Sequence, residues 1–344
     1  MNNTIYHDPI LSELDVTVND EPEPRELFKI LSANRFIEQA KKRPIPRTLF
    51  GEFWFENELC ILFADTNLGK SILAVQIADS ISRGQDISIL KMDAEPQKVL
   101  YYDFELSDKQ FENRYSENYS NHYIFSDNFL RAEMNPYADI PESFNDFESY
   151  LSHSLEQSII ENDVKIIIID NITYLRNETE KARTALPLMK ELHALKSKYG
   201  LSILALAHTP KRDLSKPLTR NDLQGSKMLI NFCDSAFAIG ESTRDTGMRY
   251  LKQIKARATE IIYHSENVLV CQIEKAENFI EFAFTGYGSE YEHLKQLSAE
   301  DSEKLNTDII EMKRENPDYS NREIAKLLNT NHKRVGRALK RNNL

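Results

Sequence analysis

Residues 59–72 read LCILFADTNLGKSI, and this stretch decides the fold. Residues 59–63 are apolar throughout, which is typical of a short strand. Residues 71–81 then place apolar side chains at helical spacing. Between strand and helix, residues 64–71 match the pattern G-x-x-x-x-G-K-[ST] except at its first position, where Ala64 stands in place of glycine. The stretch therefore predicts a strand, a phosphate-binding loop and a helix in succession.

The chemistry of such a loop explains its residues. Consecutive backbone N–H groups and the start of a helix form a binding site for phosphate oxygens. A lysine adds a mobile positive charge on the β- and γ-phosphates, and a serine hydroxyl is a ligand for Mg²⁺. The methyl group of Ala64 is tolerated if its φ angle is negative. We expect ATP with Mg²⁺ at Asp65, Thr66, Asn67, Leu68, Gly69, Lys70, Ser71 and Ile72; the alternative is a chance strand–turn–helix.

Two acidic residues follow other strand-like runs. Asp170 ends the run IIII at 166–169, so we expect its carboxylate at the carboxyl edge of a sheet as a second Mg²⁺ ligand. The alternative is an aspartate that caps the next turn. Asn171 follows Asp170 where some ATPases carry a glutamate base, so the base must come from elsewhere. Glu105, just beyond the strand-like run 98–104, is the candidate, unless it is a surface residue before a helix.

Strands and helices alternate along the first two thirds of the chain. Apolar or β-branched runs at 98–104, 164–169 and 201–207 are separated by segments of helical or irregular pattern, including a helix at 179–199. This alternation predicts a parallel sheet with right-handed crossovers. Residues 232–286 instead predict antiparallel hairpins. The predicted fold class is α/β, a P-loop core with a mostly parallel sheet plus antiparallel hairpins.

The order of these motifs resembles the RecA-like ATPases. The motifs are GKS at 69–71, a strand ending in DFE at 103–105, IIIIDN at 166–171 and LALAHTPKR at 204–212. Within that family the chain is most similar to the plasmid RepA and DnaB-type hexameric helicases and the related KaiC and RadA group. The resemblance covers roughly residues 45–285. It implies a RecA-like fold, ATP hydrolysis and a homo-oligomer, with a hexameric ring as the expected form.

The resemblance also implies roles for single residues. Glu105 would polarise the attacking water, and His208 would sense the γ-phosphate, although a lone histidine after a strand can also be a plain turn residue. Lys255 and Arg257 match a Lys-x-Arg pair that such hexamers insert into the neighbouring subunit's ATP site. The alternative is a pair of solvent-exposed strand charges.

Residues 209–223 match the family's mobile loop, which contacts single-stranded DNA in a central channel. They include Lys211 and Arg212, and cations on a flexible groove can follow a phosphate backbone. The segment has no aromatic residue on which a base could stack, and a solvated surface loop is the alternative.

Charge is divided unevenly along the chain. The 43 basic and 54 acidic residues give a net charge of −11, which taken alone argues against a nucleic-acid partner. Residues 320–344, however, hold seven basic side chains and one acidic, so this tail is +6 and the rest is −17. A capping box at 320–323 opens one short helix, and 332–341 form a second. The tail resembles a helix-turn-helix, which would place Lys333, Arg334 and Arg337 on duplex DNA; a protein-binding winged helix is the alternative.

Composition limits the remaining classes. Three widely spaced cysteines form neither a disulfide framework nor a zinc site, which indicates a reducing compartment. There is no basic segment followed by an apolar run at the N-terminus, and the apolar runs are too short to span a bilayer. We therefore expect a cytoplasmic protein without a membrane partner.

The predicted organisation has four parts. These are an acidic N-terminal segment with a helix (1–45, the helix from about Glu26 to Lys41), an ATPase domain (46–288), a linker (289–300) and a helix-turn-helix domain (301–344). The predicted function is a DNA-linked oligomeric ATPase, a RepA/DnaB-like helicase or a replication or mobilisation ATPase. Two alternatives stay open: an ATP-dependent regulatory switch without unwinding, and an ATP-binding scaffold without hydrolysis.

Overall fold

The computed structural model describes residues 28–135, 137–175, 185–210, 212–223, 226–296, 299–328 and 330–342. Residues 1–27, which include most of the predicted acidic segment, and Lys211 lie outside the described residues. The chain divides into two compact units, Met1–Ile45 and Pro46–Leu344. The first carries helix α1 (Ala33–Ala40). The prediction of a helix from Glu26 was wrong in its start, because Ser32 adopts an extended conformation and its hydroxyl caps the helix at Arg35 N.

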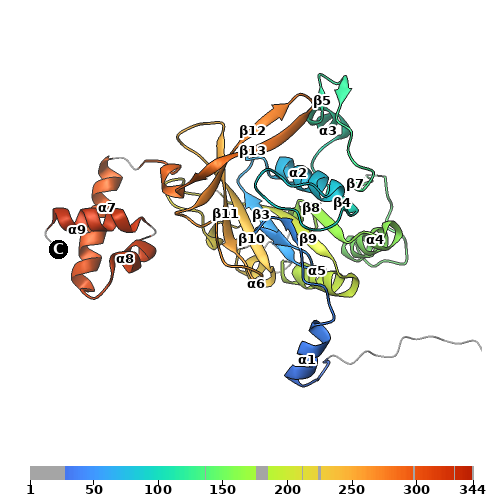
Figure 1. Ribbon diagram of the computed structural model, residues 1–344, viewed down its shortest axis with the longest axis horizontal. Helices are drawn as coiled ribbons and strands as arrows, with labels where there is room; N and C mark the ends of the chain where they lie inside the picture. The colour runs from blue at the N-terminus through green and yellow to red at the C-terminus, as the bar shows by residue number, and fades with distance from the viewer. Residues whose placement is uncertain are drawn as a thin grey trace, which may run out of the picture. The chain divides into compact units, whose positions relative to one another are not determined.

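A mixed α/β architecture is confirmed in the second unit. Its large sheet has the strand order β13-β12-β11-β10-β3-β9-β8-β4-β7 among the described residues (Figure 1). Neighbours from β10 to β7 run parallel, and the pairs β10–β11, β11–β12 and β12–β13 are antiparallel. The strands are β3 (Leu59–Ala64), β4 (Val99–Asp103), β7 (Phe129–Glu133), β8 (Ile166–Asp170), β9 (Ser202–His208), β10 (Ser235–Glu241), β11 (Met248–Lys255), β12 (Val268–Ala276) and β13 (Phe279–Gly288).

Each central strand is buried on both faces. In β3, Cys60 and Leu62 join one apolar cluster, and Ile61 and Phe63 join the other. The first cluster is closed by α2 (Lys70–Arg83), and the second by α4 (Phe147–Asn162), α5 (Ala185–Tyr199) and α6 (Ser226–Phe232). Burial on two faces is why β3, β8 and β9 are apolar along almost their whole length.

Strand β7 was not predicted. Its sequence, FLRAE, mixes apolar and charged residues, and each of its side chains is at least partly exposed. It lies at the edge of the sheet and pairs only with β4 among the described strands. An edge strand lacks the continuous apolar run that reveals a central strand, so its pattern was missed.

Three helices at the C-terminus share a small core of their own. They are α7 (Ala299–Glu315), α8 (Asn321–Leu327) and α9 (His332–Arg341), and their buried residues are Ile309, Ile324, Ala325, Val335, Ala338 and Leu339. The predicted capping box is confirmed, because Glu323 N donates to Ser320 Oγ at 3.2 Å and Ser320 N donates to Glu323 Oε2 at 2.7 Å. Helices α8 and α9 therefore pack on each other and on α7 through this shared core.

The remaining elements are short. They are β1 (Thr48–Phe50), β2 (Trp54–Phe55), α3 (Asp108–Arg114), β5 (Ser116–Glu117), β6 (Asn121–His122) and the short helices Ile172–Leu175, Arg220–Asp222 and Glu290–Glu292. Among the helices in the described ranges, none combines the length and apolar character needed to cross a bilayer.

Candidate ATP-binding site

The strand register brings the predicted site residues to one edge of the sheet. Ala64, the last residue of β3, pairs with His208 at the end of β9. Asp103, the last residue of β4, pairs with Asp170 at the end of β8. Parallel strands end at the same edge, and ligands of open α/β sheets bind there. Four segments that are distant in sequence therefore present polar side chains to one place.

The loop after β3 requires glycine at position 69. Gly69 has φ +92°, and a Cβ atom there would lie 2.6 Å from Ile273 Cδ1 and 2.9 Å from Phe282 Cε2. The hairpin β12–β13 thus covers the loop closely, and no larger residue fits without a shift. Ala64 does not have a positive φ angle, so its methyl group is accommodated as expected.

Lys70 lies folded into the loop at the start of α2. Its Nζ donates to Ala64 O at 3.2 Å and to Asp65 O at 3.0 Å, and lies 3.2 Å from His208 Nδ1. Burial lowers the pKa of Lys70, while the negative charges of Asp170 and Glu105 act in the opposite direction. Its partners here are neutral carbonyls and an imidazole, so a phosphate oxygen would be a stronger partner for the ammonium group.

Asp170 has the features of a metal ligand. Its Oδ2 accepts a hydrogen bond from Tyr101 Oη at 2.5 Å, whereas its Oδ1 is buried without a hydrogen-bond partner among the described residues. Burial raises the pKa of Asp170 to about 6, although the hydroxyls of Ser71 and Tyr101 lower it in part. A buried carboxylate oxygen without a partner beside a serine hydroxyl fits the oxygen ligands that Mg²⁺ prefers. Tyr101 was not predicted to be part of the site.

Glu105 is held by two neighbours. Asn171 Nδ2 donates to Glu105 Oε1, and His208 Nε2 lies 3.4 Å from the same oxygen. The hydrogen bond from His208 is the main cause that lowers the pKa of Glu105, with smaller contributions from Asn171 and Lys70. The other ring nitrogen of His208, Nδ1, faces Lys70, while its Nε2 also lies 2.9 Å from Asn171 Nδ2. Lys70, His208 and Glu105 therefore form one continuous chain of contacts.

Asp103 fixes the turn that carries Glu105. Its Oδ1 accepts from Glu105 N at 3.2 Å and Leu106 N at 2.9 Å, and its Oδ2 accepts from Arg131 Nε at 2.9 Å. Neither Asp103 nor Asn171 was predicted as a site residue. Asp103 lies in the DFE motif, but its role depends on Arg131 of β7, the strand that the sequence did not reveal.

Lys255 and Arg257 lie at the opposite edge of the sheet. Strand β11 runs antiparallel to β10, and Lys255 pairs with Ala236 near the start of β10. Lys255 Nζ donates to Ile230 O at 2.5 Å and Cys233 O at 2.6 Å, and Arg257 Nη1 lies 3.1 Å from Asp234 Oδ1. The register places Lys255 level with Ile61 of β3, about 10 Å along the strand before Ala64, where the phosphate loop begins. The structure does not bring the pair into its own chain's site.

The segment predicted to be a mobile DNA loop is anchored at its centre. Leu218 N donates to Glu290 Oε1 at 2.6 Å, and Lys252 Nζ lies 2.6 Å from Glu290 Oε2, with both charged side chains buried. Arg212 is partly buried beside Tyr250. The backbone at Leu218 is therefore tied to a buried ion pair, and the predicted mobility of the segment stays a prediction.

The predicted DNA-contacting residues of α9 differ in exposure. The side chains of Lys333 and Arg337 are exposed, whereas Arg334 is half-buried and its Nη2 donates to Ser302 Oγ of α7 at 2.6 Å. Arg334 is therefore committed to contacts within the helical domain.

Comparison with known families agrees with the geometry. A family model described as an AAA domain matches residues 22–213, more than half of the chain, so the chain belongs to this family. The family comprises P-loop ATPases related to RecA- and DnaB-type proteins, which generally bind ATP with Mg²⁺ and hydrolyse it. The matched range contains the phosphate loop, Glu105, Asp170 and His208, and ends before Lys255 and the C-terminal helices. No curated protein matches the chain.

Proposed function

We propose that this protein is a DNA-linked ATPase that acts as a homo-oligomeric ring and converts ATP to ADP and phosphate, in the manner of the RepA and DnaB-type helicases. The observation that carries the proposal is the chain of contacts from Lys70 through His208 to Glu105 at the carboxyl edge of the sheet. It joins a phosphate-binding cation to a carboxylate able to polarise water.

Each side chain then has a task in hydrolysis. Residues 65–72 bind the phosphates through backbone N–H groups and Lys70. Ser71 and Asp170 would hold Mg²⁺, which when bound supplies positive charge to the β- and γ-phosphate oxygens. Glu105 orients the attacking water and accepts its proton. His208 links Lys70 to Glu105, because its Nδ1 contacts Lys70 and its Nε2 contacts Glu105. A shift of Lys70 toward a bound phosphate would therefore change the contacts of Glu105.

The position of Lys255 and Arg257 supports a site shared between subunits. Their side chains contact groups at the amino edge of the sheet, whereas the phosphate loop lies at the carboxyl edge, so in that role they would serve another copy. A cation inserted from a neighbour stabilises charge on the transferred phosphoryl group and adds about 10³–10⁵-fold to the rate in related enzymes. Hydrolysis in this account depends on assembly.

The DNA link rests on the basic C-terminal helices and the 209–223 segment. The tail is +6 in a chain of net charge −11, and exposed Lys333 and Arg337 lie on α9. Counterion release by such cations is the usual source of DNA affinity.

A regulatory switch without unwinding is the second candidate. The lowered pKa of Glu105, caused chiefly by His208, makes this carboxylate a weaker base. Slow hydrolysis would suit a protein in which ATP sets the oligomeric state.

Turnover measurements test the proposal. ATP hydrolysis is measured for the wild type and for Lys70→Ala, each with and without single-stranded and duplex DNA. We expect wild-type turnover that DNA stimulates and that Lys70→Ala abolishes, since the phosphate-binding cation is gone. Wild-type turnover no higher than that of Lys70→Ala would contradict both enzymatic functions. Unwinding of a forked duplex separates the helicase from the switch.

A further inference from the structure

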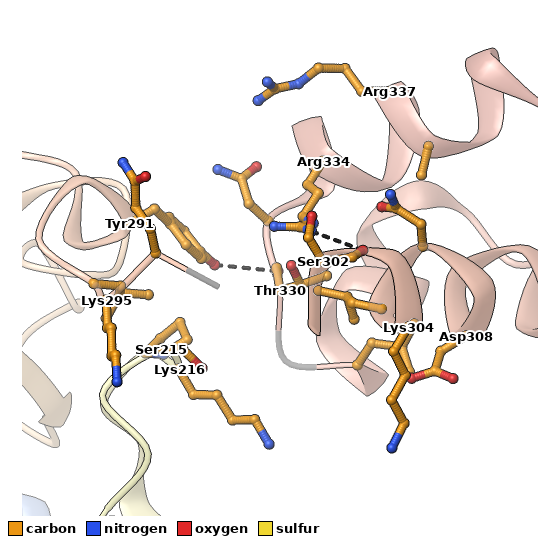
Figure 2. A pocket seen from close by; sticks show the side chains of 18 of the residues that line it. Ser215, Lys216, Tyr291, Lys295, Ser302, Lys304, Asp308, Thr330, Arg334 and Arg337 are labelled. Atoms are coloured by element: carbon orange, nitrogen blue, oxygen red, sulfur yellow. Dashed lines mark hydrogen bonds between the residues drawn. The ribbon is translucent and has the colours of Figure 1, made fainter. Parts of the chain in front are cut away.

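A cleft of about 1170 Å³ lies between the ATPase core and the C-terminal helices, both within the second compact unit. Figure 2 shows Tyr291, Lys295 and Lys216 on one wall and Lys304, Arg334 and Arg337 on the other. The walls are joined by Tyr291 Oη, which donates to Thr330 O at 3.5 Å, and by the contact of His332 Nδ1 with Glu266 Oε1 at 3.2 Å. Core segments 213–217 and 291–296 thus face helices α7 and α9.

The lining of the cleft is strongly cationic. It contains two carboxylates, Asp213 and Asp308, and six cations: Lys216, Lys295, Lys304, Arg334, Arg337 and Arg341. The lining is therefore +4, although the whole chain is −11. Cations that gather in a hollow focus their field on it, which favours an anionic ligand.

The core wall is held together by hydrogen bonds and a buried ion pair. Lys295 N donates to Leu214 O at 3.0 Å, so the segments that carry Lys216 and Lys295 are tied together. Both segments are held from below by the buried pair of Lys252 and Glu290, because Glu290 also accepts from Leu218 N. Because these segments are already ordered, binding a ligand costs little conformational entropy on this wall, which favours affinity.

The helical wall holds an incompletely satisfied arginine. Arg334 donates to Ser302, but its Nε is buried without a hydrogen-bond partner among the described residues. Burial and the neighbouring charge of Arg337 lower the pKa of Arg334. The positive charges of Arg334 and Arg337 therefore lie close together without a carboxylate between them in the described part of the chain. A bound phosphate would supply the missing negative charge and accept hydrogen bonds from these side chains.

We propose that this cleft binds a single strand of DNA, an inference that rests on the proposed function of a DNA-linked ATPase. The strand's phosphates contact Lys216 and Lys295 on the core wall and Arg337 and Arg341 on the helical wall. Tyr291, the aromatic residue of the lining, offers a ring on which a base stacks, which the 209–223 segment itself lacks.

A single strand fits this geometry better than a duplex. A duplex reader projects its recognition helix into the major groove. Here Arg337 and Arg341 line a hollow that faces the core, whereas Lys333 and Lys340 of the same helix do not line it. The helix thus carries two sets of cations, and each nucleic-acid form would use a different set.

The experiment uses the full-length protein with ATP and measures affinity for a fluorescent oligothymidine and for a duplex at several salt concentrations. The variants are Lys216→Ala with Lys295→Ala on the core wall and Arg337→Ala with Arg341→Ala on the helical wall. The matched control is Lys333→Ala with Lys340→Ala, which removes two cations from the same helix outside the cleft. Wild-type turnover with and without DNA is measured in parallel.

We expect each cleft variant to lose about tenfold in single-strand affinity at low salt. The slope of log K against log salt should fall by about 1.4, because each single-strand phosphate contributes about 0.7. The control should bind the single strand as the wild type does. The inference is overturned if the core-wall variant binds normally, if the control loses as much as the Arg337 and Arg341 variant, or if the cleft variants lose more duplex than single-strand affinity.

Parallel turnover separates the two proposals. DNA-stimulated turnover with normal single-strand binding by the cleft variants would overturn the cleft alone. A wild type that hydrolyses ATP but neither binds DNA nor responds to it would overturn the DNA link, and the cleft with it.

Discussion

At the carboxyl edge of the sheet, Lys70, His208 and Glu105 contact one another across strand ends, whereas at the amino edge Lys255 and Arg257 contact groups that belong to a neighbouring helix and turn. The first edge leaves a buried Asp170 oxygen without a partner among the described residues. At the second edge each cation has partners, since Lys255 contacts carbonyls at the end of α6 and Arg257 contacts Asp234.

This difference separates two kinds of evidence for a site. An edge with unsatisfied polar atoms is complete only with a ligand, so its chemistry can be derived within one chain. At the amino edge the cations already have partners, so the described structure of one chain gives no sign of a ligand there. A role in a neighbouring subunit's site would require Lys255 and Arg257 to leave these partners. Substitutions at each edge should therefore have different effects on ATP turnover and on stability.

A large effect is expected at the amino edge. Arg257→Ala should lower turnover by about 10³-fold in the assembled protein, because a cation in trans stabilises the transferred phosphoryl group. Mixing Arg257→Ala with Glu105→Ala protein should restore part of the activity, since a Glu105→Ala subunit supplies the intact cation to a neighbour with an intact base. If light scattering shows that both variants assemble, failure to recover activity at any ratio would assign Arg257 to a structural role.

A smaller effect is expected from Asn171 at the carboxyl edge. Asn171→Ala should lower turnover by about tenfold with little change in ATP affinity, because the amide that positions Glu105 is lost. Asn128→Ala is the matched control, since Asn128 donates to Ser82 O at 3.2 Å away from the site. Equal effects of the two variants on turnover would argue against a positioning role.

The smallest effect is expected on the free energy of unfolding, through Asp234 at the amino edge. Burial alone would raise the pKa of Asp234, but the hydrogen bonds from Lys196 and Leu59 N outweigh it and the pKa is lowered. A folded-state pKa below the unfolded value gives stability that is present at neutral pH and is lost as the pH falls through the folded-state pKa.

Asp234→Asn should therefore lower the free energy of unfolding by about 1–3 kcal/mol at pH 7. The difference from the wild type should shrink below about pH 4, near the usual pKa of an aspartate. Urea unfolding at both pH values measures it, with exposed Asp139→Asn as the control. A deficit that is independent of pH would show that the ionised form of Asp234 does not stabilise the fold.

The sequence predicted the secondary structure best where strands are buried on both faces of the sheet. Strand β3, the phosphate loop and α2 follow from an apolar run, a glycine and helical spacing, all within 59–83. Asp170 and Glu105 followed from the rule that strand ends meet at one edge. Strand β7 could not be predicted in this way, because it is partly exposed and carries the charged residues Arg131 and Glu133.

Contacts between distant residues could not be read from the sequence. Asn171 was interpreted as the absence of a glutamate, and its contact with Glu105 spans 66 positions along the chain. The anchoring of the 209–223 segment by Lys252 and Glu290 was likewise invisible, because two charged residues 38 positions apart in the sequence give no sign that both are buried. Pairing across a fold depends on packing, for which a single sequence carries no local pattern.

We propose that Glu105 is the base of an ATP-hydrolysing site at the carboxyl edge of the sheet. The most direct test is steady-state ATP turnover of Glu105→Gln, with ATP affinity measured on the same protein. We expect turnover to fall by about 10²–10⁴-fold while ATP affinity stays close to that of the wild type, because the amide keeps the shape of the side chain but cannot accept the proton. Turnover equal to that of the wild type would contradict the account.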